Sequence, residues 1–389
     1  MLMNNIWKYA SLLMTAAVLS VSCGGDGGST GIDPEPPVNV DGELTLTIDK
    51  DIIRNDGSDA AVLTVKMGET VLTEGVTFFD GDNKAMDITD FKFRTDKSGV
   101  YEIWASYLTF NTAKVSMTAV PAGMPETPAD PQPEKTSFHR NVLLVQFTGT
   151  GCTNCPGMKT ILKQVMEEEG MKDKIVKVSA HNYNEDDPAY LNKQQFPGAG
   201  GYPTISLDMI DFQALTTGLT YKHVVDWINE RHAEEPAKAG IAASVTYADG
   251  SMVVKAVVKG AEESNVRVAA FLLENGIRGQ QAGAGANDTE MNTHNESMRL
   301  ADCGNGAAGH ALGRLTAGQT AEYKFIWDLN GARQQWNLMP YGGTTWKAPV
   351  IENCYVVVCI YTPVAGGSDY CVNNAVVCPI NGKVQFDYE

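Results

Sequence analysis

The chain has 389 residues, of which 43% are hydrophobic and 20% are charged, a composition that suits two or three domains with ordinary buried cores. Acidic residues outnumber basic ones by 47 to 30, and the formal net charge of −17 argues against a nucleic-acid-binding protein, because it repels phosphate backbones. The eight cysteines are too few for a small disulfide-rich scaffold. The composition therefore leaves an acidic multidomain protein whose cysteines need individual interpretation.

Residues 1–22 are typical of an export signal. Lys8 is followed by an apolar run from Ala10 to Val21, which is too short to cross a bilayer, since a spanning helix needs about 20 residues. Cys23 follows a small residue and precedes two glycines. This arrangement resembles a bacterial lipoprotein signal, which implies that Cys23 is lipidated and becomes the first residue. The alternative is a buried first helix.

Two segments are predicted to connect folded parts. Residues 23–40 are rich in glycine and have no apolar periodicity, which is typical of a flexible tether. Residues 121–137 hold five prolines between Pro121 and Pro133, a density that prevents a helix or a strand ladder. We therefore expect a semi-rigid proline-rich linker there.

Three segments are predicted to fold. Residues 41–120 contain short alternating stretches separated by turn signals, which predict an immunoglobulin-like β-sandwich. Residues 138–236 alternate strand and helix patterns. Residues 238–389 return to strands, with Asp249-Gly250 as a hairpin signal, and predict a C-terminal β-sandwich. The predicted fold class is therefore multidomain, α/β plus all-β.

The middle segment predicts a βαβ-type module. Residues 142–147 form an apolar run typical of a strand that is covered on both faces. Residues 158–166 repeat apolar side chains at helical spacing, and residues 174–180 and 204–207 predict two further strands. Thr220 can cap a last helix.

Cys152 and Cys155 form a CxxC pair between a predicted strand and a predicted helix. Two cysteines three positions apart in a first helical turn can close a disulfide. The unpaired N–H groups and the helix dipole at that end stabilise a thiolate, which lowers the pKa of the first cysteine. Cys152 is therefore the candidate nucleophile, and Cys155 is the thiol that resolves a mixed disulfide.

The strand, the CxxC pair that opens a helix and the later segment Tyr202-Pro203-Thr204 together resemble the thioredoxin fold over about residues 141–235. The resemblance implies that Pro203 is cis and lies against the disulfide. It also implies a substrate groove, which we expect Tyr202, Pro203 and Gly151 to border. A cis bond is accessible there because proline weakens the preference for trans.

Two residues depart from the thioredoxin pattern. Gly151 stands where tryptophan is usual, and Gln146 stands where a carboxylate is usually buried. A glutamine cannot accept a proton, so proton transfer involving Cys155 needs another base or water. His181 follows the second strand and is either a ligand, a base or a structural residue.

The CxxC pair itself has two further interpretations. It can be an inert stabilising disulfide, or it can be part of a zinc site. The sequence has no second CxxC and no HxxxH, so it argues against zinc, and no metal site is predicted.

Five cysteines of the mature chain remain: Cys303, Cys354, Cys359, Cys371 and Cys378. A turn near residues 365–367 would join the last two cysteine-bearing strands into a hairpin. Its register predicts that at least one of the pairs Cys354–Cys378 and Cys359–Cys371 lies within bonding distance. The alternative is that all of these are small buried apolar residues.

The order of the parts resembles the Omp-twenty-eight-related family of bacterial outer-membrane lipoproteins. The supporting segments are FTGTGCTNCPGM, GGYPT, GIRGQQ and HNESMR, at residues 147–158, 200–204, 276–281 and 294–299. The resemblance implies a location in the cell envelope more directly than it implies a reaction. His294 and Arg299 do not have the spacing of a metal or catalytic pair, so we interpret them as a structural polar network.

Two functions are compatible with these features. The first is a thiol–disulfide oxidoreductase that acts on exported cysteine-containing proteins through Cys152 and Cys155. The second is a non-catalytic surface or periplasmic binding or scaffold lipoprotein, in which the same disulfide is structural. Both place the protein in the envelope, anchored to the outer membrane by a lipid on Cys23. We expect no cofactor beyond the redox-active disulfide, and no nucleic-acid partner.

Overall fold

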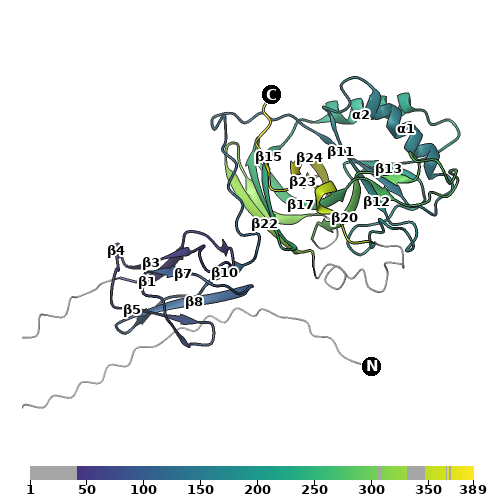
Figure 1. Cartoon of the computed structure of the whole chain (residues 1–389). Helices are drawn as coiled ribbons and strands as arrows, with labels where there is room; N and C mark the ends of the chain where they lie inside the picture. The colour runs from purple at the N-terminus through teal and green to yellow at the C-terminus, as the bar shows by residue number, and fades with distance from the viewer. Residues whose placement is uncertain (1–41, 305–307, 331–346, 365, 368) are drawn as a thin grey trace, which may run out of the picture. The chain divides into compact units, whose positions relative to one another are not determined.

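The computed structural model describes residues 42–304, 308–330, 347–364, 366–367 and 369–389, and this part of the chain is mostly β-structure in several sheets with two α-helices (Figure 1). The predicted predominance of β-structure is confirmed. The predicted signal peptide, Cys23 and the tether lie outside the described residues. In the described ranges, no helix is both long and apolar enough to cross a membrane.

Residues 42–120 fold into small antiparallel sheets with one parallel strand pair. Burial alternates along the third strand, where Ala61, Leu63, Val65 and Met67 are buried and the residues between them are not, as expected for a sheet with one solvated face. One sheet contains β1 (Leu44–Ile48), β3 (Ala61–Met67), β4 (Thr70–Val71) and β7 (Lys92–Phe93). The other contains β2 (Ile52–Ile53), β5 (Val76–Asp80), β6 (Ala85–Met86), β8 (Gly99–Tyr107), β9 (Phe110–Asn111) and β10 (Val115–Ala119).

A nine-stranded mixed sheet organises the rest of the chain. Its order is β14-β13-β11-β12-β20-β17-β23-β24, with β21 also paired to β17. The strands are β11 (Val142–Thr148), β12 (Ile175–His181), β13 (Thr204–Leu207), β14 (Asp211–Ala214), β17 (Ser264–Glu274), β20 (Ser297–Asp302), β21 (His310–Leu315), β23 (Cys354–Pro363) and β24 (Tyr370–Pro379). Strands from both sides of the predicted boundary near residue 237 therefore share one sheet.

Strand β11 separates two hydrophobic cores. Val142 and Leu144 pack with the two helices, α1 (Cys155–Glu167) and α2 (Tyr221–Glu234). Leu143, Val145 and Phe147 point to the opposite face and pack with side chains of β17, β20, β23 and β24. Both faces are thus covered, which explains the continuous apolar run in the sequence. On the face opposite the helices, the cover consists of C-terminal strands together with Leu191 and Phe196 from the segment between β12 and β13.

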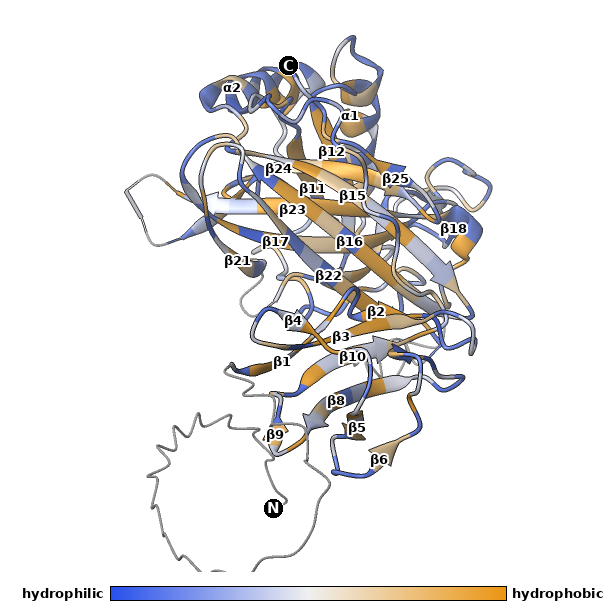
Figure 2. Ribbon diagram, turned by 90° about the vertical axis from the view of Figure 1, so that its left-hand side faces the viewer, coloured by the Kyte–Doolittle hydropathy of each residue, from blue (hydrophilic) through white to orange (hydrophobic). Residues whose placement is uncertain are grey.

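A four-stranded sheet, β22-β16-β15-β25, shares a large apolar core with β17, β23 and β24. Its strands are β15 (Ala239–Ala248), β16 (Ser251–Gly260), β22 (Thr320–Asp328) and β25 (Lys383–Val384). In Figure 2 much of β15, β16 and β23 is orange, which marks hydrophobic residues. The Asp249-Gly250 hairpin is confirmed, since both residues have positive φ, at 47° and 77°, between paired β15 and β16.

The remaining short elements are β18 (Ile277–Arg278), β19 (Thr293–His294) and a 3-10 turn (Ile351–Asn353). Strands β18 and β19 pair with each other and bracket the loop of residues 279–292. We call residues 279–286 the covering loop, because they lie over the CxxC segment, as described below.

The predicted cross-hairpin disulfides are wrong. Strands β23 and β24 do pair, but Val356 lies opposite Cys378 and Ala375 lies opposite Cys359, so the register is shifted from the one expected. A β-bulge between Ile360 and Tyr361 shifts it again before Cys371. Within the described residues, the five cysteines outside the CxxC pair are free and buried, in agreement with the alternative that they are small core residues.

Candidate functional site

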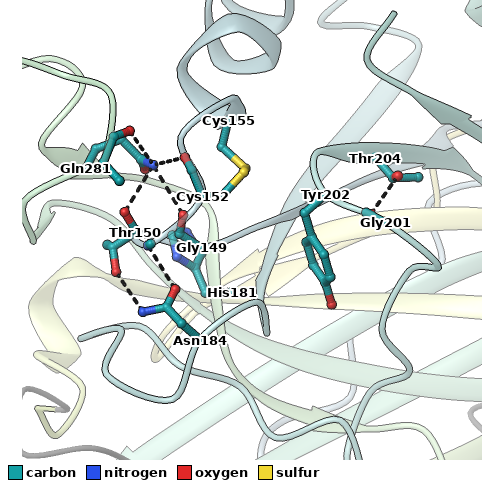
Figure 3. The surroundings of a disulfide bond; sticks show 12 residues. Gly149, Thr150, Cys152, Cys155, His181, Asn184, Gly201, Tyr202, Thr204 and Gln281 are labelled. Atoms are coloured by element: carbon teal, nitrogen blue, oxygen red, sulfur yellow. Dashed lines mark hydrogen bonds between the residues drawn. A yellow bond between two sulfur atoms is a disulfide. The ribbon is translucent and has the colours of Figure 1, made fainter.

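Cys152 and Cys155 form a disulfide with a Cα–Cα distance of 5.4 Å. Cys155 is the first residue of α1, and Asn154 is its N-cap, so the pair lies where strand β11 leads into the helix. Both cysteines are buried, with exposed fractions of 3% for Cys152 and 2% for Cys155. In Figure 3 the disulfide lies between Gln281 on one side and Tyr202 on the other.

The covering loop holds the backbone that precedes the disulfide. The Gln281 side-chain amide donates to the carbonyl oxygens of Cys152, Gly149 and Thr150, at 2.9, 3.2 and 3.3 Å. The Ala282 amide also donates to the Thr150 carbonyl, at 2.7 Å. These bonds link a segment more than 120 positions away in the sequence to the CxxC motif (Figure 3). The Gly149 and Cys152 carbonyls also accept backbone amides of their own turn, from Cys152 and Cys155, so the covering loop adds partners to an already ordered segment.

Gly283 brings the covering loop into contact with the CxxC segment. Its φ is +81°, and a Cβ atom placed on it would lie 2.5 Å from the Thr153 carbonyl oxygen. A side chain at this position is therefore excluded both by the left-handed backbone and by the close approach.

Replacing Gly283 with alanine should consequently uncover the disulfide. We expect the loop to shift and the rate of reduction by dithiothreitol to rise about tenfold, since losing about 1.4 kcal/mol of closure energy has that effect on the open population. The matched control is Gly285→Ala in the same loop, where an added Cβ meets nothing within 4 Å. Equal reduction rates in the two variants would contradict this interpretation.

The glycines before Cys152 are explained by a neighbouring loop. The Gly151 amide donates to Asn184 Oδ1 at 2.9 Å, and a Cβ atom on Gly151 would lie 3.0 Å from Asn184 Cγ. At Gly149 an added Cβ would lie 2.6 Å from Tyr183 Cβ. The Tyr183-Asn184 segment therefore lies close against both glycines and leaves little room for a side chain at either position.

The Tyr202–Pro203 peptide bond is cis, as the resemblance implies, and it lies directly before β13. The Tyr202 hydroxyl donates to Asn182 Oδ1 at 2.8 Å, and its ring lies 5.2 Å from that of Tyr183. Tyr183 is 47% exposed. The proposed groove residues Tyr202 and Gly151 therefore approach the same loop, residues 182–184, from two sides.

Gln146 is buried on β11, opposite Ser179 of β12. The Ser179 hydroxyl donates to its side-chain oxygen at 3.5 Å. An amide in this place cannot take up a proton, so the group that would serve Cys155 in an exchange reaction has to come from elsewhere.

A cavity of about 310 Å³ lies beside Cys155. Gln146, Thr148 and Gln281 line it next to the disulfide, together with His181 and His294. The residues in the described ranges include no cluster of three or more His, Cys, Asp or Glu side chains that could hold a metal ion.

His181 belongs to a buried pair with Asp187. Its Nδ1 atom lies 2.9 Å from Asp187 Oδ2, and the same oxygen accepts the Thr150 amide at 2.6 Å. Burial acts to raise the pKa of Asp187, but the charge and hydrogen bond of His181, with the amides of Thr150 and Ala189, outweigh it and hold this pKa at about 2. Asp187 is therefore a carboxylate, and the shared hydrogen lies on His181 Nδ1.

His294 comes from the segment HNESMR and meets this pair. Its ring lies 5.0 Å from the His181 ring, nearly perpendicular to it, and its Nε2 donates to the Gly279 carbonyl at 3.0 Å. Burial lowers the pKa of His294 to about 4, and the charge of His181 acts in the same direction. His294 is therefore neutral at neutral pH.

The sequence predicts one structural polar network for His294 and Arg299, but the two side chains have different partners. Arg299 is buried and forms an ion pair with Glu274, whereas His294 lies against His181. Asp187 and Gln281 were not among the predicted site residues. The segment GIRGQQ, which contains Gln281, supports the family resemblance, but nothing local in the sequence relates it to Cys152.

Comparisons with known proteins identify no family. No family model and no curated protein sequence matches the chain. Among solved structures, HBP35 of Porphyromonas gingivalis is similar, with 18% identity and a TM-score of 0.48, over 63% of this chain and 77% of that one.

Proposed function

We propose that the chain is an envelope lipoprotein of the Omp-twenty-eight-related kind, anchored to the outer membrane through Cys23. In this proposal a thioredoxin-like module exchanges thiols and disulfides with exported proteins through Cys152 and Cys155. Cys152 attacks the substrate disulfide, and Cys155 then resolves the mixed disulfide.

The arrangement of strands supports the thioredoxin-like assignment. Strand β11, helix α1 and parallel strand β12 are followed by antiparallel β13 and β14 and then by α2, in the sheet order β12-β11-β13-β14. The disulfide stands at the start of α1, and the cis bond stands at the start of β13. A fold alone does not determine a reaction, so the activity depends on the site.

The single observation that carries the activity is the position of the disulfide between an N-terminal helix end and a polar cavity. Helix N–H groups favour a thiolate at this end. The cavity reaches Cys155 and contains groups that can take up a proton. Because both cysteines are buried, exchange with a protein substrate requires the covering loop to open.

One observation favours the second function, a non-catalytic binding or scaffold lipoprotein. The three hydrogen bonds from Gln281 fix the CxxC backbone, and the disulfide is almost inaccessible. A covered and hydrogen-bonded disulfide of this kind is typical of a structural crosslink.

A redox titration of the Cys152–Cys155 pair separates the two functions. We expect a potential above about −300 mV, together with reduction of a model disulfide protein that is abolished in Cys152→Ser. A matched control is Cys303→Ser, which removes a buried thiol whose pKa burial raises to about 12. A potential below about −300 mV with an unreactive Cys152 thiol would establish the structural role instead.

The proposed lipid anchor on Cys23 can be tested separately from the redox activity. Replacing Cys23 with serine should move the protein from the membrane fraction to the soluble fraction and abolish incorporation of labelled fatty acid, because the remaining tether carries no apolar segment. Continued membrane association of the variant would contradict a lipid anchor at Cys23.

A further inference from the structure

We infer that His181, oriented by Asp187, is the proton acceptor for the Cys155 thiol in the resolving step of disulfide exchange. The inference rests on the proposed function and assigns to His181 the proton transfer that Gln146 cannot perform.

The geometry connects this pair to the CxxC motif in two ways. Asp187 Oδ2 accepts both from His181 Nδ1 and from the amide of Thr150, two residues before Cys152. His181 is also paired in the sheet with Thr148, at the same strand ends from which the CxxC segment departs. The imidazole therefore lies at the disulfide end of the sheet and not at its far end.

The cavity provides the route for the proton. Cys155 and His181 both line it, and its volume of about 310 Å³ is enough for several water molecules, which each need about 30 Å³. With Nδ1 donating to Asp187, Nε2 of a neutral His181 ring carries the lone pair that accepts a proton. A chain of water molecules can carry a proton from the sulfur to this atom.

The other charged groups of the cavity are engaged or distant. Glu290 pairs with Lys163, and Glu296 pairs with Lys177. Lys159 Nζ donates to the carbonyls of Glu290, Met291 and Thr293.

Two further charged lining groups, Glu167 and Lys172, come from the far end of α1 and from beyond it. Glu167 lies more than three turns beyond Cys155 on α1, about 18 Å along the helix, and Lys172 follows the end of that helix. His294 is neutral and uses Nε2 to donate to Gly279.

The mixed disulfide joins Cys152 to a substrate sulfur, and Cys155 is a thiol. Its proton passes to His181, its thiolate attacks Cys152 Sγ, the Cys152–Cys155 bond forms, and the bond from Cys152 to the substrate breaks. The substrate sulfur leaves with the electron pair and takes up a proton, which the His181 imidazolium returns. The two cysteines are oxidised, and the substrate disulfide is reduced.

The test follows both steps with dithiobis(nitrobenzoate), a disulfide probe that releases one coloured thiolate per step. The reduced full chain carries Cys23→Ser to remove that thiol. The first release reports attack by Cys152, and the second reports resolution by Cys155 and disappears in Cys155→Ser. We expect His181→Gln to leave the first release unchanged and to slow the second at least tenfold at neutral pH.

His310→Gln is the matched control, because His310 also forms a histidine–aspartate pair, with Asp302 at 2.6 Å, but does not line the cavity. A second release that is unchanged in His181→Gln, or equally slowed in both histidine variants, would overturn the inference and leave the exchange activity standing. Absence of the first release in the parent chain would overturn the proposed function itself. Release of no more than two thiolates per chain in His181→Gln also shows that the five other described cysteines stay buried and that this variant is folded.

Discussion

Replacing Asp208 with alanine should lower the free energy of unfolding by about 3–5 kcal/mol, the cost of breaking a buried ion pair by removing one partner. Asp208 is fully buried at the end of β13. Its carboxylate accepts from Arg140, from Arg231 Nε at 2.8 Å and from the Leu143 amide at 2.8 Å. The substitution leaves two buried guanidinium groups without their shared anion.

Chemical denaturation followed by circular dichroism measures this loss. The control is Asp211→Ala, three residues further along the chain, where the side chain is exposed and a change within about 0.5 kcal/mol is expected. The Asp208 network also connects distant elements, because Arg140 donates to the Asn373 carbonyl in β24 and to the Arg231 carbonyl in α2. Equal stabilities of the two variants would show that this network contributes little.

Lowering the pH from 7 to about 4 should destabilise the protein by about 3 kcal/mol through His294 alone. The folded-state pKa of His294 is about 4, below its ordinary value of 6.5. As the pH falls through 6.5, the unfolded chain binds a proton there and the folded chain does not, so stability falls until about pH 4 and then levels off. The size follows from 1.36 kcal/mol for each unit of difference.

The free energy of unfolding of the parent chain and of His294→Gln can be measured by chemical denaturation at pH 7 and at pH 4.5. The variant keeps a side-chain donor for the Gly279 carbonyl. The variant should lose markedly less stability than the parent chain over this interval. Asp187 contributes in a separate pH range, because its folded-state pKa of about 2 lies below the ordinary 3.8. The stabilisation by its carboxylate is present above pH 3.8 and is lost as the pH falls from 3.8 towards 2. The same pH dependence in both proteins would contradict the buried, neutral state of His294.

The strands and helices of the middle segment were accessible to sequence analysis because each depends on a local pattern. The apolar run at residues 142–147 corresponds to β11, and Thr220 is the N-cap of α2, accepting from the His223 amide. The hairpin at Asp249-Gly250 followed from two residues that tolerate positive φ. In each case the deciding interactions lie within a few residues of one another.

The pairing of the distant cysteines failed for the opposite reason. The residue spacing predicted that β23 and β24 form a hairpin, but the register depends on the turn and on the bulge at Ile360, which the cysteine positions do not reveal. The cysteines fit their sites as small buried side chains. Cys303, for example, donates to the Gln195 carbonyl at 3.1 Å.

The sequence by itself determined the mostly-β character and the placement of the CxxC pair at a strand-to-helix junction. The composition alone gives eight cysteines and an acidic net charge and does not identify a site. These conclusions rest on side-chain chemistry and on periodicities that act over a few residues.

Only the tertiary structure decided what surrounds the pair. It brings Gln281 onto the CxxC carbonyls, places His294 against His181 and joins β12 to β20 in one sheet. Each contact joins residues more than 100 positions apart, and its energy arises only when buried polar groups find partners in the assembled core. A local sequence pattern does not indicate such distant partners. The covering loop over the disulfide and the packing of His294 against His181 could therefore be identified only from the folded structure.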